Sequence, residues 1–125
     1  MAATRQQIDA ALQGVQTVDI TTTGRKSGQL RKLEIVAHNI DGRIYISGIP
    51  FPRRRSWLAN LDADPRMTLH LKGKLHADLP ATARVIEDEA ERREILPYIA
   101  RNWGRKDLEK MVEQSPLIEV TVDAG

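Results

Sequence analysis

The chain has 125 residues, of which 41% are hydrophobic and 29% charged, so it has the composition of a soluble globular protein and the length of one domain, residues 1–125. It contains no cysteine, which excludes disulfides, thiolate metal sites and a cysteine nucleophile. No apolar run approaches the roughly 20 residues that span a bilayer, and no signal-peptide-like segment follows Met1. We therefore expect a cytoplasmic protein.

The net charge of +2 is unevenly distributed. Residues 1–76 carry 12 Lys and Arg against 6 Asp and Glu, a net charge of +6, whereas residues 77–125 carry 7 against 11, a net charge of −4. An anionic ligand should therefore bind to the first part of the chain.

That first part alternates short amphipathic segments with turns. Residues 4–12 favour a short helix capped by Thr4. Alternating β-branched and apolar residues then predict three strands joined by two turns: residues 18–23, a glycine-bounded turn at 24–28, residues 33–37, an Asp-Gly turn at 41–42 and residues 43–47. A proline-bounded loop follows at residues 49–55.

From residue 56 onward the chain shows one further hairpin turn and three helical patterns. The expected elements are a helix over 56–62 capped by Ser56, a strand over 67–71, a turn at 72–74, a strand over 75–86, a helix over 88–102 capped by Asp88, a helical stretch from Asp107 ended by Pro116, and a strand over 117–122. Pro80 predicts an edge or a bulge in its strand. About six strands, mostly linked as hairpins, predict a mainly β, α+β protein: a small antiparallel barrel with helices packed outside it.

Two basic clusters are the first candidates for function. Two glycines enclose Arg25, Lys26 and Ser27, and the N–H groups of such a turn can cradle a phosphate or carboxylate that the cations neutralise. Three arginines at residues 53–55 directly precede a helix, whose N-terminus also favours anions. Either cluster alone could be a solvated basic loop, but two in one small domain favour an anion-binding site.

The aromatic residues give weaker signals. Only 4% of the residues are aromatic and none alternates with basic residues, so a nucleic acid is not an expected partner. Trp57 could form the wall of a planar cofactor's site, although packing in the core is the more frequent role of a lone tryptophan. Tyr98 is expected, together with Ile95, Leu96 and Ile99, on the buried face of its helix.

The three histidines are interpreted as surface or strand residues. His38, His70 and His76 fall on separate strands, and the last two are expected to face each other across a hairpin. No acidic partner or third ligand is evident for a metal, and no Ser/His/Asp arrangement has supporting context.

A longer signal spans both basic clusters. The string Ile20-Thr-Thr-Thr-Gly-Arg-Lys-Ser-Gly-Gln-Leu-Arg31 is followed by Trp57-Leu-Ala-Asn-Leu-Asp-Ala-Asp-Pro65 and a strand. In this order and spacing the two strings resemble the deazaflavin (F420)-dependent nitroreductase family, and the resemblance runs from about Val18 to Val122. It implies a split β-barrel related to flavin-binding reductases, coenzyme F420 as the cofactor, and no metal.

The resemblance also implies which residues bind the cofactor. In the family, the G-R-K-S-G turn and nearby basic residues hold the phosphate and polyglutamate tail of F420, and the loop before the W-x-x-N-L helix contributes. The implied cofactor-binding residues are Arg25, Lys26, Ser27, Gly28, Arg31, Arg53, Arg54, Arg55, Trp57 and Asn60. One polyanionic ligand would account for both basic clusters, while the catalytic residues stay unassigned.

The first functional hypothesis is accordingly an F420H2-dependent reductase that transfers a hydride to an activated double bond or nitro group of a small, hydrophobic substrate. The alternatives are a non-catalytic deazaflavin or lipid carrier, and an FMN-binding split-barrel protein. FMN has a single phosphate and needs fewer cations than the two clusters offer. Split-barrel relatives are often dimers, which leaves a homodimer and a monomer both open.

Overall fold

The computed structural model describes residues 4–123, and this part of the chain forms six strands and four helices. In chain order the elements are α1 (Arg5–Ala11), β1 (Val15–Thr23), β2 (Leu30–Ile40), β3 (Arg43–Ser47), α2 (Ser56–Ala63), β4 (Arg66–Lys72), β5 (His76–Val85), α3 (Glu89–Trp103), α4 (Leu108–Gln114) and β6 (Leu117–Val122). Their types and order confirm the sequence-based prediction. The first two strands are longer than expected, because they pair continuously from Val15↔His38 to Thr23↔Leu30.

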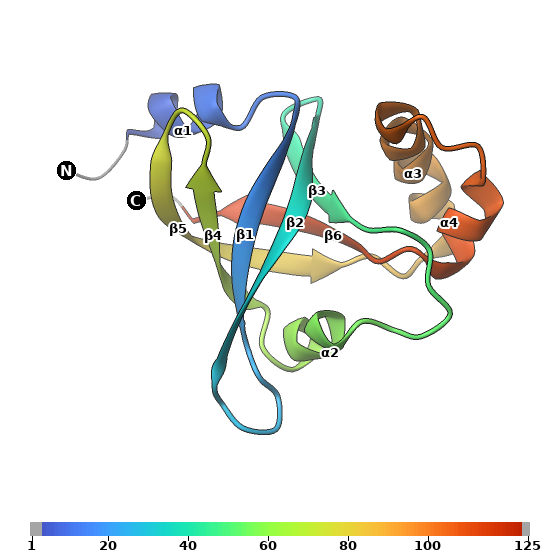
Figure 1. Ribbon diagram of the computed structural model, residues 1–125, viewed down its shortest axis with the longest axis horizontal. Helices are drawn as coiled ribbons and strands as arrows, with labels where there is room; N and C mark the ends of the chain where they lie inside the picture. Colours follow the sequence, from blue (N-terminus) through green and yellow to red (C-terminus); the bar gives the residue numbers. More distant parts are fainter. Residues whose placement is uncertain (1–3, 124–125) are drawn as a thin grey trace.

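The six strands close into an antiparallel barrel in the order β1-β2-β3-β6-β5-β4 (Figure 1). The predicted antiparallel barrel is therefore confirmed. Because the barrel is closed, each of its strands pairs with a neighbour on both sides over at least part of its length. The far end of the β1–β2 hairpin projects beyond the barrel, beside α2 (Figure 1).

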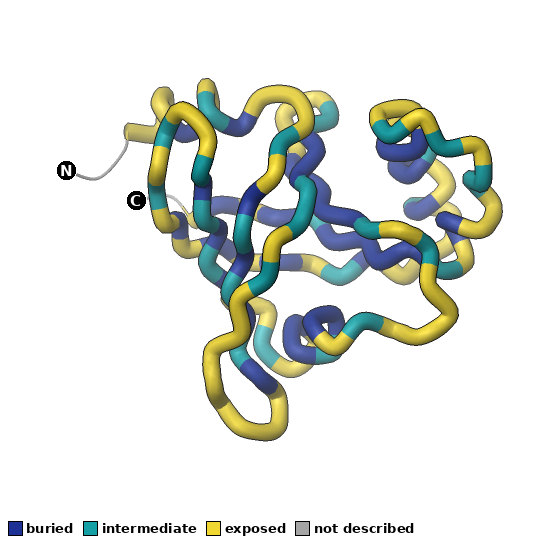
Figure 2. The backbone as a smooth tube through the Cα atoms, in the orientation of Figure 1, coloured by how far each residue is buried: buried dark blue, intermediate teal, exposed yellow. Residues whose placement is uncertain are grey.

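The barrel interior is filled by the alternate residues that the strand patterns predict. In β4, for example, Met67, Leu69 and Leu71 are buried, whereas Thr68 and His70 are only partly covered. The two short helices lie at opposite ends of the barrel: α1 covers one end and α2 the other (Figures 1 and 2). Both helices add their apolar residues to the barrel core.

A second core lies outside the barrel, where α3 and α4 pack on β3 and β6 (Figure 1). It combines Tyr45 and Leu117 from the strands with Leu96, Ile99 and Met111 from the helices. Because this second core covers one outer face of the barrel, residues that point outward there are buried as well.

The caps of α3 agree with its sequence. The Asp88 carboxylate accepts a hydrogen bond from the N–H of Glu91 at 2.9 Å, and Gly104 ends the helix with φ +64°. Tyr98, however, is 48% exposed, so its expected place on the buried face of α3 is wrong. The neighbouring positions of the helix already fill the contact with the strands.

The expected capping role of Ser56 is wrong, and of the two expectations for Pro80, an edge or a bulge, the bulge is wrong. Ser56 is the first residue of α2, and its N-cap is Arg55, with no side-chain hydrogen bond to the free N–H groups. Pro80 causes no bulge, because the β4–β5 register is continuous through Thr68↔Pro80. Pairing with β6 begins only at Ala81, so the missing N–H of the proline is not needed.

The histidines differ most from the sequence-based interpretation. His38 is completely buried, because α3 covers the outer face of β2 at that point. Its Nδ1 lies 3.2 Å from the Asn102 amide nitrogen, and its ring meets that of Trp103 edge-on at 5.0 Å. His38 is therefore a strand residue, as one of the two expectations had it, but it is not on the surface.

His70 and His76 do not face each other either. His70 pairs with Asp78 across the β4–β5 hairpin, and His76 pairs with Lys72. His70 therefore has an acidic partner, Asp78 on the neighbouring strand, which no sequence pattern revealed. None of the described helices is long and apolar enough to cross a membrane.

Candidate functional site

The glycine-bounded turn connects β1 to β2, and both of its glycines are required by the backbone. The Gly24 N–H donates to the Gln29 carbonyl at 2.7 Å, and a Cβ on Gly24 would lie only 3.0 Å from that same oxygen. Gly28 donates to the Gly24 carbonyl at 2.8 Å and has φ +72°, a conformation that favours glycine. The turn is thus a compact, hydrogen-bonded loop.

Asn60 of α2 fixes this turn against the helix. Its Oδ1 accepts hydrogen bonds from the Arg25 backbone N–H at 3.2 Å and from the Arg25 Nη1 at 3.1 Å. Its Nδ2 donates to the Thr22 hydroxyl at 3.3 Å. Asn60 is only 6% exposed in this arrangement. Asn60 therefore positions Arg25 and couples the turn to α2.

Between the turn and the start of α2 lies a pocket of about 460 Å³, here called the turn pocket. It is lined by Gly24, Arg25, Lys26, Ser27, Arg31, Leu33, Ser56, Trp57 and Asn60. Three of these residues are basic, and the described lining includes no acidic residue. Trp57 forms part of the wall while only 8% exposed and packed in the barrel core, so it takes part in both the core and the pocket.

The turn pocket gathers six of the ten residues that the family resemblance implied. Gly28 shapes the turn without lining the pocket. The three arginines of the second basic cluster, Arg53, Arg54 and Arg55, instead line a larger neighbouring pocket. The two basic clusters are therefore adjacent along the start of α2 but open into different cavities.

The larger cavity, here called the helix pocket, has a volume of about 680 Å³ and lies between residues 51–55 and the helices α3 and α4. Apolar residues such as Phe51, Leu58 and Val112 form part of its lining. Its charged lining is mixed, with Arg53, Arg54, Arg55, Arg92 and Arg93 facing Glu87, Glu89, Glu109 and Glu113. Unlike the turn pocket, the helix pocket balances its cations with carboxylates.

Two of the three clustered arginines are already engaged by other groups. The Arg54 Nη2 lies 2.7 Å from an Asp62 oxygen and 2.6 Å from a Glu87 oxygen. The Arg55 guanidinium donates to the Ile49 carbonyl at 2.9 Å and lies over the ring of Phe51. An anion can recruit Arg54 only in competition with two carboxylates of the protein itself.

Sequence reasoning missed Arg92, which borders the helix pocket from α3. Its guanidinium is buried and donates to four backbone carbonyls, those of Ile86 at 2.9 Å, Met111 at 3.1 Å, Val112 at 2.8 Å and Ser115 at 2.5 Å. Burial lowers the pKa of Arg92. Its position in the sequence could have indicated that Arg92 is buried. It lies three residues before Ile95 and four before Leu96, on the apolar face of the helix.

The chain matches the family of F420H2-dependent quinone reductases over residues 1–124. It belongs to that family. The protein is therefore an oxidoreductase, an F420-dependent reductase whose cofactor is coenzyme F420. The resemblance to F420-dependent enzymes stated from the sequence is thereby confirmed, and the carrier and FMN alternatives lose their support.

Solved structures agree with this assignment. The structure of an F420H2-dependent reductase is 25% identical, covers 84% of this chain and 93% of its own, and superposes with a TM-score of 0.60. A structure described as a domain-swapped dimer is 26% identical, with 84% and 79% of the two chains covered and a TM-score of 0.54.

A conserved hypothetical protein of Mycobacterium tuberculosis shares the fold at 16% identity, with 98% and 82% of the two chains covered and a TM-score of 0.71. The predicted split-barrel class is confirmed. No curated protein matches the chain at a significant level of similarity.

The chemistry of the turn pocket fits the anionic part of F420. Arg25, Lys26 and Arg31 supply positive charge where the described lining has no competing carboxylate. The Trp57 side chain adds an apolar wall. A set of cations of this kind suits a phosphate or a chain of carboxylates.

Proposed function

We propose that this reductase holds the phosphate and glutamate tail of F420 in the turn pocket and reduces an activated double bond or nitro group of a small hydrophobic molecule. The observation that carries the first part is the convergence of Arg25, Lys26 and Arg31, from a turn and a strand, on one pocket without a described carboxylate. The family description adds quinones as acceptors, which are conjugated and apolar.

The helix pocket is the proposed site of the acceptor. It adjoins the turn pocket through residues 53–57, and its apolar side chains suit a small hydrophobic molecule. When bound, reduced F420 supplies the hydride. The protein binds the tail through its cations, keeps Arg25 oriented through Asn60, and excludes water from the acceptor with the apolar side chains of the helix pocket.

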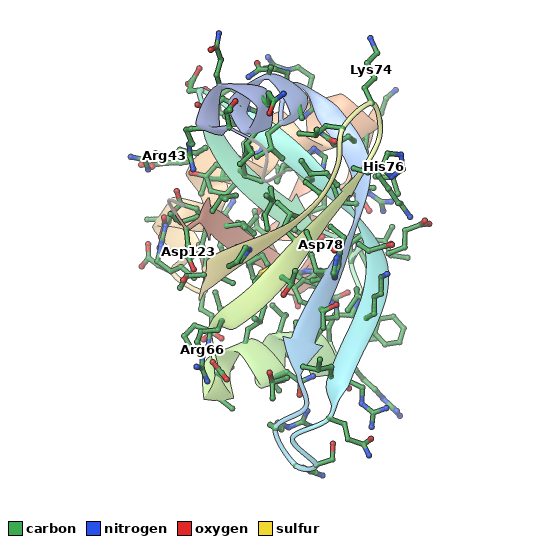
Figure 3. The ribbon with its side chains drawn as sticks, turned by 90° about the vertical axis from the view of Figure 1, so that its left-hand side faces the viewer. Arg43, Arg66, Lys74, His76, Asp78 and Asp123 are labelled. Atoms are coloured by element: carbon green, nitrogen blue, oxygen red, sulfur yellow. The ribbon has the colours of Figure 1, made fainter. Side chains whose placement is uncertain are left out.

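The test compares Lys26→Ala with Lys74→Ala, which removes the same charge at the β4–β5 turn, at the opposite end of the barrel (Figure 3). Losing one charge-assisted contact typically costs about 1.5–3 kcal/mol, or roughly 10- to 150-fold in affinity. Because the tail is bound alike before and during the reaction, Lys26→Ala should raise the KM for F420H2 and leave kcat nearly unchanged.

The measurements are F420 titration followed by tryptophan fluorescence, and steady-state kinetics with a quinone, an enone and a nitro compound as acceptors. Affinity of the parent protein should fall as salt rises, since the tail contacts are ionic. If Lys26→Ala binds F420 as Lys74→Ala does, the turn pocket is not the tail site. Tighter binding of FMN than of F420, independent of salt, would also contradict the proposal.

A further inference from the structure

The outer face of the barrel carries a hydrogen-bonded chain of three side chains that the reductase site does not use. The Thr21 hydroxyl of β1 lies 2.7 Å from Nε2 of His70 on β4, and Nδ1 of His70 lies 2.6 Å from a carboxylate oxygen of Asp78 on β5. Cross-strand pairing fixes the arrangement, because His70 stands directly opposite Asp78 in the ladder. Figure 3 shows Asp78 on this face, away from the turn at the tip of the β1–β2 hairpin.

The partners of the imidazole determine what it can do. Asp78 is a carboxylate whose pKa is lowered mainly by its hydrogen bond to His70, so Asp78 accepts a hydrogen bond from Nδ1–H. In the neutral ring, Nε2 then has no proton and accepts the hydrogen bond of the Thr21 hydroxyl. A hydroxyl bonded to a basic nitrogen, with the second nitrogen oriented by a carboxylate, is the constellation of acyl-transfer enzymes.

The surroundings suit a small substrate. Thr21 and His70 are partly exposed and the Asp78 side chain is 79% exposed, so the three residues lie at the surface of the barrel. Lys32 is the direct cross-strand neighbour of Thr21 on β2 and brings a cation to the same face, where its Nζ lies 3.9 Å from an Asp19 oxygen. A cation at this place can stabilise the negative charge that develops on a carbonyl oxygen.

We propose that Thr21, His70 and Asp78 form a second active site that hydrolyses small, activated carboxylic esters. As the Thr21 Oγ1 attacks the ester carbonyl carbon, its proton passes to Nε2 of His70. The C–O bond to the alcohol breaks and the alkoxide takes that proton. Water then attacks the acyl-threonine, again losing a proton to Nε2, and the carboxylic acid leaves as the Thr21 oxygen regains a proton. Asp78 acts as a positioning residue.

The probe is p-nitrophenyl acetate, without F420, so the outcome is independent of the proposed reductase site. Thr21→Val and His70→Gln should each lower the protein-dependent rate by about 100-fold or more, the usual contribution of a general base and its nucleophile. Thr21→Ser keeps the hydroxyl and should retain activity. Asp78→Asn should lower the rate while leaving the Thr21 hydroxyl in place, because the amide no longer selects the required tautomer.

Matched controls separate this site from ordinary surface reactivity. Thr17→Val changes a threonine on the same face of β1, and His76→Gln changes an exposed histidine on β5; both should hydrolyse the ester as the parent does. Mass spectrometry of the acetylated protein should find the acetyl group on Thr21, and the chain has no cysteine to compete for it. Acetyl groups only on lysines, or an unchanged rate in Thr21→Val, would overturn the proposal.

Discussion

At the scale of single residues, the partners of an arginine decide which anions it can bind. Arg54 stands in the basic cluster that the family resemblance assigned to the F420 tail, but its guanidinium already contacts Asp62 and Glu87. A ligand anion must displace these carboxylates to reach it. Lys26, by contrast, is exposed in a pocket whose described lining has no acidic residue. The two cations should therefore differ in how much each contributes to binding.

If the F420 tail extends past the turn pocket to Arg54, as the family resemblance implied, Glu87→Gln should strengthen F420 binding. The Arg54 side chain is 42% exposed, so its pairing with Glu87 is worth at most about 1 kcal/mol, and its removal should improve affinity by no more than about fivefold. Arg54→Ala should weaken binding less than Lys26→Ala. The control is Glu89→Gln, which removes a carboxylate of the same pocket that pairs with Arg93. Equal effects of the two glutamine variants on titration with F420 would exclude competition at Arg54.

Residues near each other in the motif were easier to place from the sequence than residues joined across the fold. The family resemblance of the two strings implied that the turn and the start of α2 act together, and the bond between Asn60 and Arg25 shows that they are in contact. Arg54 and Glu87 are 33 positions apart and Arg54 lies in an exposed loop, so no periodic pattern in the sequence predicts their pairing. The same holds for the contact of Thr21 with His70.

At the scale of elements, α3 and α4 depend on one buried side chain. The guanidinium of Arg92 donates to the carbonyls of Ile86, Val112 and Ser115. It also donates to the Met111 carbonyl, which accepts the Ser115 N–H as well. No carboxylate is among its hydrogen-bond partners in the described part of the chain. Arg92 therefore replaces the glycine-based cap that α4 lacks, and it joins the two helices to the end of β5.

Arg92→Met should lower the free energy of unfolding by about 2–4 kcal/mol, because several buried carbonyls lose their donors while the apolar stem is kept. Arg92→Lys should also destabilise, since an ammonium cannot reproduce the planar fork of donors. Urea denaturation measures both changes, with Arg101→Met on the exposed side of α3 as the control. If Arg92→Met lowers the free energy of unfolding no more than Arg101→Met does, water replaces the donors that the carbonyls lose.

Local patterns predicted the elements well and their ends less well. The alternation of apolar and polar residues in β4 and the Asp-Gly turn before β3 were sufficient to predict these strands, because a hairpin is formed by residues that are close in the sequence. Ser56 was assigned to the N-cap by its residue type, but the Arg55 carbonyl already accepts from Leu58 and Ala59, so the N-cap lies one residue earlier, at Arg55. Residue type alone cannot resolve a shift of one position.

At the scale of the whole molecule, the decisive feature is which outer face of the barrel the helices cover. The strand pattern distinguishes the inside of a barrel from its outside, but it does not show that α3 lies over β2 and β3. His38 is an example. Its side chain points outward from the barrel, yet it is buried because Asn102 and Trp103 of α3 cover it. Its Nε2 has no hydrogen-bond partner within the described structure. Burial lowers the pKa of His38 from 6.5 to about 4.

This buried histidine should make the stability of the whole protein depend on pH between about 6.5 and 4. In that window the unfolded chain binds a proton at His38 and the folded chain does not, so the free energy of unfolding falls as the pH falls. The full shift corresponds to at most about 3 kcal/mol. Urea denaturation at a series of pH values measures the slope, and His38→Gln, which cannot titrate, should flatten it whatever its stability at pH 7.

Carboxylates held by arginines, such as those of Glu91 and Glu109, have lowered pKa values and lose their contribution to stability only at still lower pH. An equal slope in the parent protein and His38→Gln would show that His38 is protonated without unfolding, through an opening of α3 from the barrel.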